Sequence, residues 1–423
     1  MNKIKNYSLI KNIWKKRKDS KVISNYIYLL LIQGTNFILP LITFPYLVRT
    51  LGLEKYGVVM IASSLVVFLN IVVDFGFNIS ATREVSIIRN NKEKLSTYYW
   101  NVFYTKLLLL FISFLFLIFL ILTFEKFQSE YLIYLFSFGI VFGQNIFPAW
   151  FFQGIERMKV ITIINVLAKI IFAISIFIFI NNESEYIRVP IFNSLGFIIS
   201  GIIGFLISLK YVDYHKPKFM IMKGFINENK NLIASNFATS IYTSGNTFIL
   251  GMIGGDTIAG VYSSMEKLVM ATKTIYTPLY QAIFPWLANK SKTEIITFIN
   301  KLKKPILISG IIISSIIYIF AEPILNLVYN DPIINSYAYI FKILGFIALV
   351  ASLNMIYVSL CFPSLKLYKF RMIPMVLGGI INLVLAIIGA SFYSILGTAI
   401  AAVFSEFMIL IISHYYFKNK III

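Results

Sequence analysis

The chain has 423 residues, of which 58% are hydrophobic and 13% are charged, and its formal net charge is +20. Soluble proteins are closer to half apolar and a quarter charged, so this composition excludes a soluble globular protein and predicts one with many membrane spans. The single cysteine, Cys361, excludes an intrachain disulfide and a multi-cysteine metal cluster. We expect neither a metal site nor a cofactor.

Apolar runs close to the ~20 residues that a helix needs to cross the hydrocarbon recur along the chain. They show no strand-like alternation, so we expect an all-α polytopic membrane protein and not a barrel. The runs predict about twelve transmembrane helices, at residues 25–49, 56–80, 97–124, 130–154, 159–180, 188–209, 230–253, 257–286, 303–321, 335–361, 367–390 and 394–417.

Basic residues are unevenly divided between the two sides of these spans. One side, which includes the basic segment 1–24 and the carboxyl terminus, carries 29 Lys and Arg, and the other carries four. The positive-inside rule therefore predicts cytoplasmic termini in the cell membrane, which is the inner membrane in a Gram-negative cell. The net charge is explained by this asymmetry and by attraction to anionic membrane lipids, so no nucleic-acid partner is expected.

The two halves of the chain repeat one pattern. LGLEKYGVV follows the first predicted span, and IGGDTIAGVY follows the seventh. With six spans in each half, the repeats have the same orientation and are related by an axis along the membrane normal. We expect an N-lobe at 25–220 and a C-lobe at 221–423.

Polar side chains form a stripe at helical spacing on the first and seventh spans. The stripe on the seventh span contains Asn236, Ser240, Thr243 and Thr247, and the thinner one on the first contains Asn36, Pro40 and Thr43. Such stripes either pack helices together or line a hydrated cavity. The density of polar residues on the seventh span favours a cavity there.

Five lysines lie inside predicted spans: Lys106, Lys169, Lys267, Lys273 and Lys342. A charge at mid-bilayer costs about 2.5–3.5 kcal/mol on insertion scales, so these side chains must face water, partners or substrate. The three deepest, Lys169, Lys267 and Lys273, are predicted to line a cavity. Glu266 lies on the same helix face as Lys273, and the two charges are expected to compensate each other. Deep positive charge suits an anionic cargo.

Asp74 is an acid near the end of the second predicted span. Lys106, on the third span, reaches a similar depth from the same side. Two interpretations stay open: a structural Asp74–Lys106 ion pair, or a titrating carboxylate that couples transport to protons.

Three segments of the first half carry a resemblance to a known family. NYIYLLLIQGTNFILPLITFPYLVRTLGLEKYG, VDFGFNISATRE and FPAWFFQGIERMKVITIIN resemble the Wzx-type polysaccharide flippases of the multidrug/oligosaccharidyl-lipid/polysaccharide exporter superfamily. The resemblance implies two six-helix lobes, a central cavity that opens alternately to each side, and a lipid-diphosphate-linked oligosaccharide as cargo. It implies possible pathway partners as well, namely a polysaccharide polymerase and glycosyltransferases. It supplies no binding residue, and Arg49 is a further candidate for contacting the cargo.

Two other function classes remain open. A drug or metabolite antiporter would share the architecture. Such an antiporter would be favoured if carboxylates outnumbered lysines inside the predicted spans, but in this chain they do not outnumber them. A membrane-embedded glycosyltransferase or polymerase would need a sizeable outer loop, and the predicted outer loops are short. No catalytic motif occurs, so we expect a transporter and not an enzyme.

Overall fold

A computed structural model describes residues 2–287 and 290–422, and the secondary structure of these residues is entirely helical. The α-helices of the first half are α1 (Asn2–Asp74), α2 (Phe77–Ile88), α3 (Lys92–Thr123), α4 (Glu125–Ser129), α5 (Tyr131–Ile146), α6 (Ala149–Gly154), α7 (Met158–Phe179) and α8 (Arg188–Ser208), with the short 3₁₀ turn η1 (Glu183–Glu185). Those of the second half are α9 (Phe219–Ile253), α10 (Asp256–Leu287), α11 (Lys292–Ile319), α12 (Ala321–Tyr329), α13 (Pro332–Ser336), α14 (Ala338–Met355), α15 (Phe362–Ser364) and α16 (Tyr368–Tyr416), with the π-helical segments η2 (Ile356–Cys361) and η3 (Phe417–Ile422).

Eight helical segments in the described residues are long and apolar enough to cross a membrane, so this is a multi-pass membrane protein. Two long helices contain an internal break. α1 breaks at Gly52, with φ 69° and ψ 167°, and α16 breaks at Ser394, with φ 48° and ψ −127°. Positive φ is easily adopted by glycine, which has no Cβ, and this explains why the chain can turn at Gly52. The total of twelve spans stays a prediction.

The two arms of α1 pack against the two helices that open the second half. Gly57 and Gly260 lie where α1 meets α10, and a methyl group at Gly57 would overlap the carbonyl oxygen of Asp256. A methyl group at Gly260 would likewise overlap the carbonyl oxygen of Leu53. The α1 and α10 backbones are therefore in direct contact, as small residues permit between membrane helices. The turns at Gly52 and Gly255 lie near this contact, at what we call the Gly52 end.

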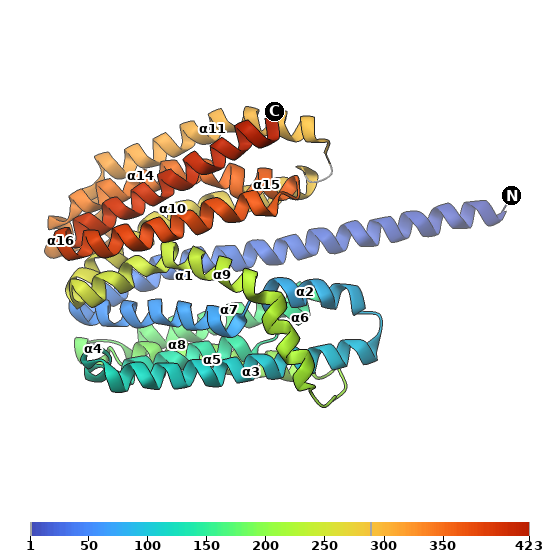
Figure 1. The fold of residues 1–423 in the computed structure, drawn as a ribbon, viewed down its shortest axis with the longest axis horizontal. Helices are drawn as coiled ribbons and strands as arrows, with labels where there is room; N and C mark the ends of the chain where they lie inside the picture. Colours follow the sequence, from blue (N-terminus) through green and yellow to red (C-terminus); the bar gives the residue numbers. More distant parts are fainter. Residues whose placement is uncertain (1, 288–289, 423) are drawn as a thin grey trace.

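Buried apolar side chains of the described residues form three clusters. The first joins the halves and includes Leu47 and Leu51 of α1 with Tyr262 and Met265 of α10. The second fills the first half around Trp150, and the third fills the second half around η2. Figure 1 shows the same arrangement, with α3, α5 and α8 in one layer, α11, α14 and α16 in another, and α1 and α9 between them.

The connection between the halves begins where α8 ends at Ser208 and is non-helical up to Lys218. Phe225, in the second turn of α9, packs edge-on against Phe77 of α2 and Tyr98 of α3, at ring-centroid distances of 5.7 and 5.4 Å. The first turns of α9 thus belong by contact to the first half. A division of the chain near residue 220 stays a prediction.

Membrane sidedness can be tested with single cysteines at Glu183 and Lys292. Cys361 is buried and can be replaced by alanine to give a background without cysteine. The charge asymmetry predicts that a membrane-impermeant maleimide labels Glu183→Cys in intact cells but labels Lys292→Cys only after lysis. Labelling of both positions in intact cells would contradict cytoplasmic termini.

Candidate functional site

A cavity of about 250 Å³ lies between the two halves, and we call it the central cavity. Its walls are the α1 segment from Asn36 to Pro45 and the α10 segment from Lys267 to Thr274, and Tyr329 at the end of α12 contributes to the lining. Pro40 and Pro45 lie within α1. Because proline has no backbone N–H, the carbonyl groups four residues earlier, at Asn36 and Leu41, lose their intrahelical donors. The α1 wall is therefore more polar than its side chains suggest.

Lys267 brings a positive charge to this cavity from the second half. It is half-buried, and its Nζ lies 5.3 Å from the centroid of the Phe44 ring on the opposite wall, a cation–π distance. In the described part of the chain it forms no ion pair. The neighbouring carboxylate, Glu266, is buried and accepts a 2.9 Å hydrogen bond from the Thr247 hydroxyl of α9. Glu266 does not line the central cavity.

Lys169 brings a second positive charge, from α7 of the first half. Its Nζ donates a hydrogen bond to the side-chain oxygen of Asn36, which lines the central cavity. Among the described residues Lys169 forms no ion pair either. Lys267 therefore lines the cavity, whereas Lys169 does not line it but is bonded to Asn36, a lining residue of the opposite wall, and the described residues that line the cavity include no acid. Such a site attracts anions.

Lys273 lies elsewhere, inside the second half. It forms an ion pair with Glu406 of α16, whose side chain is 2% exposed. Asn354 of α14 completes the group, because its amide nitrogen donates to Glu406 Oε2 at 2.7 Å and to the Glu406 carbonyl at 2.9 Å. A separate cavity of about 140 Å³ adjoins these three residues. Glu266, the partner expected from the sequence, lines a small pocket together with Lys273 and Glu406, but the ion pair is formed by Glu406. An acid inside the apolar run 394–417 was a visible signal for Glu406.

The other predicted cargo contacts that the structure describes do not line the central cavity. Asn236 is half-buried on α9 and does not line it, and the side chain of Thr243 lies outside the described residues. Thr247, from the same stripe, is buried against Glu266, so this part of the stripe packs helices together. Arg49 donates from its guanidinium to the carbonyls of Leu327, Val328 and Tyr329. It thus joins α1 to the carboxyl end of α12.

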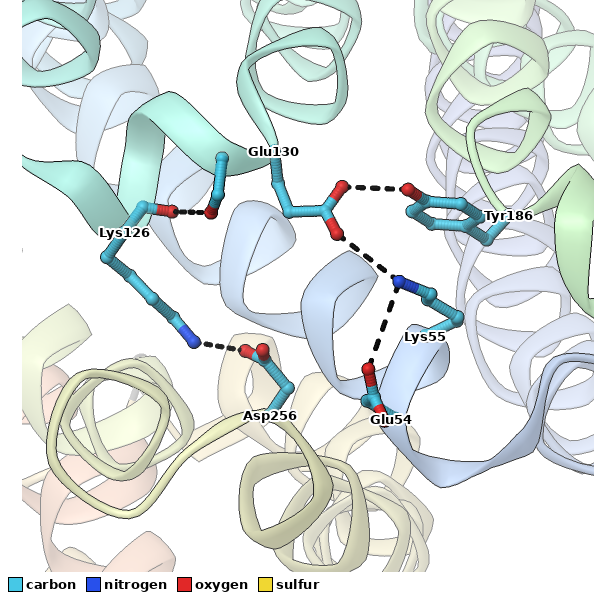
Figure 2. Close-up of polar contacts among 7 residues, drawn as sticks. Glu54, Lys55, Lys126, Glu130, Tyr186 and Asp256 are labelled. Carbon is cyan, nitrogen blue, oxygen red and sulfur yellow. Dashed lines mark hydrogen bonds and ion pairs between the residues drawn. The ribbon is translucent and has the colours of Figure 1, made fainter.

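Charged side chains also link the halves at the Gly52 end, as Figure 2 shows. Lys126 of α4 forms a 2.6 Å ion pair with Asp256, the first residue of α10. Beside it, Lys55 lies 3.4 Å from Glu130, which also accepts a 2.8 Å hydrogen bond from the Tyr186 hydroxyl. Only the Lys126–Asp256 pair in this group crosses between the halves. Together with Arg49 and the glycine contact, it closes this end of the protein.

Asp74 and Lys106 meet within the first half. Lys106 Nζ lies 3.5 Å from Asp74 Oδ1, and Lys106 is only 4% exposed. Asp74 is the last residue of α1, and a break with positive φ at Phe75 and Gly76 follows it. A carboxylate at the carboxyl terminus of a helix interacts unfavourably with the helix dipole, and the ammonium group of Lys106 offsets this.

At Gly76, a Cβ would lie 2.7 Å from Leu232 of α9, so glycine allows that helix to approach.

The family profile described as "Polysaccharide biosynthesis protein" matches residues 22–291. The chain belongs to this family. It is 31% identical over 268 residues to a protein of Escherichia coli (strain K12) named "Putative O-antigen transporter", an alignment that covers 62% of this chain and 63% of that protein. A protein of Shigella dysenteriae with the same name is 28% identical over 395 residues, covering 92% of this chain and 98% of that protein. These names describe transporters and not enzymes.

Solved membrane transporters share the fold. An inward-facing multidrug resistance transporter of the MATE family, in the MOP superfamily, superposes with a TM-score of 0.70 at 15% identity, covering 94% of this chain and 98% of that one. An outward-facing transporter of the same family gives 0.59 at 14% identity, covering 95% of each chain. A lipid II flippase in an inward closed conformation gives 0.58 at 17% identity, covering 94% of this chain and 88% of that one.

The Asp74–Lys106 pair can be tested by a double-mutant cycle. Removal of one partner leaves the other charge buried, which destabilises a protein by about 3–5 kcal/mol, whereas replacement of both by apolar residues is often neutral. We therefore expect Asp74→Leu and Lys106→Met each to lower the thermal unfolding temperature of the detergent-solubilised protein. The double variant should recover most of the loss. If the two losses simply add, the side chains do not interact.

Proposed function

We propose that the protein is a flippase that moves undecaprenyl-diphosphate-linked oligosaccharide repeat units across the cytoplasmic membrane for O-antigen or another surface polysaccharide. The observation that carries the proposal is a cavity between the halves that is lined by Lys267 from the second half and by Asn36, the hydrogen-bond partner of Lys169, from the first. Membership of the family and the names of the two relatives support it. In this proposal the cargo diphosphate binds the two ammonium groups in the central cavity.

Electrostatics makes a diphosphate a suitable ligand for this cavity. One ammonium–phosphate contact at 4 Å contributes about 4 kcal/mol at an effective dielectric near 20, before desolvation is subtracted. Because the lysines come from different halves, a diphosphate that contacts both also draws the halves together. Asn36 already holds Lys169 at the wall, so the first charge is positioned before cargo arrives.

The proposal includes the arrangement of the protein in the membrane. Twelve helices form two lobes, at 25–220 and 221–423, which move relative to each other by alternating access, and both termini are cytoplasmic. The Gly52 end then faces away from the cytoplasm and is closed in this structure. The better superposition on an inward-facing transporter than on an outward-facing one supports this assignment.

The drug-antiporter alternative is less well supported by the central cavity. A cation exporter needs a carboxylate where its cargo binds, but the described lining residues of the central cavity include none. The acids Glu266 and Glu406 are buried, and each accepts hydrogen bonds within the second half.

In the proposed pathway, glycosyltransferases supply the lipid-linked unit on the cytoplasmic side, and a polymerase consumes it on the other.

Neutral variants of the two cavity lysines test the cargo site. Lys169→Gln and Lys267→Gln should each reduce surface polysaccharide by about tenfold or more, because each removes one contact worth a few kcal/mol to an anion. The measurement is surface polysaccharide in a strain that lacks the native gene, at matched protein level in the membrane.

Lys342→Gln is the matched control, since Lys342 lies on α14, outside the central cavity, 3.4 Å from Glu322. It should leave export nearly unchanged. Full export by the Lys169→Gln/Lys267→Gln double variant would show that these lysines do not bind the cargo.

A reversible cross-link tests alternating access at the Gly52 end. With cysteines at Lys126 and Asp256, a short bis-methanethiosulfonate reagent should hold the halves together and stop export, and a reductant should restore it. Cysteines at Lys55 and Glu130, which both belong to the first half, form the control pair, and their cross-link should be tolerated. Undiminished export with the Lys126–Asp256 cross-link fully formed would contradict opening at this end.

A further inference from the structure

A second cavity, separate from the central one, lies within the second half. It has a volume of about 760 Å³ and is formed by α11, by α14 with η2, and by α16 with η3. We call it the α11–α16 groove. None of its lining residues belongs to α1 or α10, which line the central cavity. It is therefore not part of the proposed cargo path.

The groove has a basic end and an apolar body. Lys303, Lys304 and Lys418 are its charged lining residues, and no acid is among the described residues that line it. None of the three ammonium groups forms an ion pair with a described residue. The body is made by leucine and isoleucine side chains, including Leu307 and Ile411, which are 38% and 44% exposed.

Lys303 is held in place at the basic end. Lys303 Nζ lies 4.2 Å from the centroid of the Phe417 ring and donates a 2.9 Å hydrogen bond to Asn300 Oδ1. Tyr357 is buried, and its hydroxyl lies 2.8 Å from His414 Nδ1, which joins η2 to α16 across the groove. π-Helical turns such as η2 and η3 occur frequently at functional sites, because they widen a helix locally. Here both adjoin the groove.

The depth of these groups matches the region of a phospholipid headgroup. Lys303 and Lys304 begin the part of α11 that is predicted to enter the membrane, and Lys418 lies two residues beyond the end of α16. The exposed apolar side chains continue from there along α11 through Ile308 and Ile311, towards the bilayer interior. A headgroup phosphate at the lysines would thus place an acyl chain along the apolar body.

We propose that the α11–α16 groove binds an anionic phospholipid of the phosphatidylglycerol class, with its phosphate at Lys303, Lys304 and Lys418. Charge complementarity selects this occupant, because three cations without an acid favour an anionic headgroup over a zwitterionic one. A lysine near an anionic membrane surface contributes about 1 kcal/mol, which corresponds to about fivefold in affinity. The three together should give a preference on the order of 100-fold.

Native mass spectrometry of the full-length, delipidated protein in detergent tests the proposal. Titration with phosphatidylglycerol should show one site that is at least about tenfold tighter than any site for phosphatidylcholine. The variant Lys303→Gln/Lys304→Gln/Lys418→Gln should lose this preference. The control Lys292→Gln/Lys301→Gln/Lys420→Gln removes three exposed lysines from α11 and η3 that do not line the groove, and it should retain the preference.

Two further variants keep the test independent of folding. Lys418→Gln alone, at an exposed position, should weaken phosphatidylglycerol binding by about fivefold. Leu307→Trp fills the groove without a change of charge and should lower its occupancy. Equal binding of the two lipids by the unmodified protein, or an unchanged preference in the triple-lysine variant, would overturn the proposal. Displacement of phosphatidylglycerol by a lower concentration of undecaprenyl diphosphate would assign the groove to the cargo lipid instead. Because export is not the readout, the result is independent of the proposed function.

Discussion

The direct backbone contact between α1 and α10 at Gly57 and Gly260 is the constraint on which the rest of the structure depends. It brings the turns at Gly52 and Gly255 together and aligns the first arm of α1 with α10. The central cavity lies between the same two helices, and it begins about two turns along α10 from the contact, at Lys267. Side chains larger than hydrogen at either glycine would separate the helices and alter the walls of the cavity.

The internal charges are divided according to whether they have a partner of opposite sign. Asp74 with Lys106, and Glu406 with Lys273, form ion pairs with one buried and one half-buried partner, and each pair ties helices of one half together. These pairs neutralise their own charge. Lys169 and Lys267 form no ion pair with a described residue; Lys267 lines the cavity between the halves, and Lys169 is bonded to Asn36 of the same lining. Lys267 is next in sequence to the buried Glu266, which lies outside the cavity lining and accepts a hydrogen bond from Thr247. The described residues that line the cavity include a lysine and no acid, which suits an anionic cargo.

The α11–α16 groove, which is proposed to lie at the membrane interface, is a second site with basic residues and no acid among its described lining residues. The α11–α16 groove also contains cations without acidic partners, but it opens away from α1 and α10. The two sites therefore have similar charge and different surroundings. One lies between halves that are proposed to move, and the other lies within a single half. The first is suited to a transported anion, and the second to a resident lipid.

Sequence alone determined the class of the protein, because composition and the length of apolar runs depend on the bilayer and not on tertiary contacts. It also indicated that deep lysines need partners or water, since the insertion penalty applies to any lipid-facing charge. Only the tertiary structure decided which residue each deep lysine contacts. Lys273 lies beside Glu406, which is 133 residues away in sequence, and Lys169 reaches Asn36 across a similar separation. Helical periodicity fixes the face of one helix but not the rotation of its neighbours, so such pairings follow only from how the helices pack.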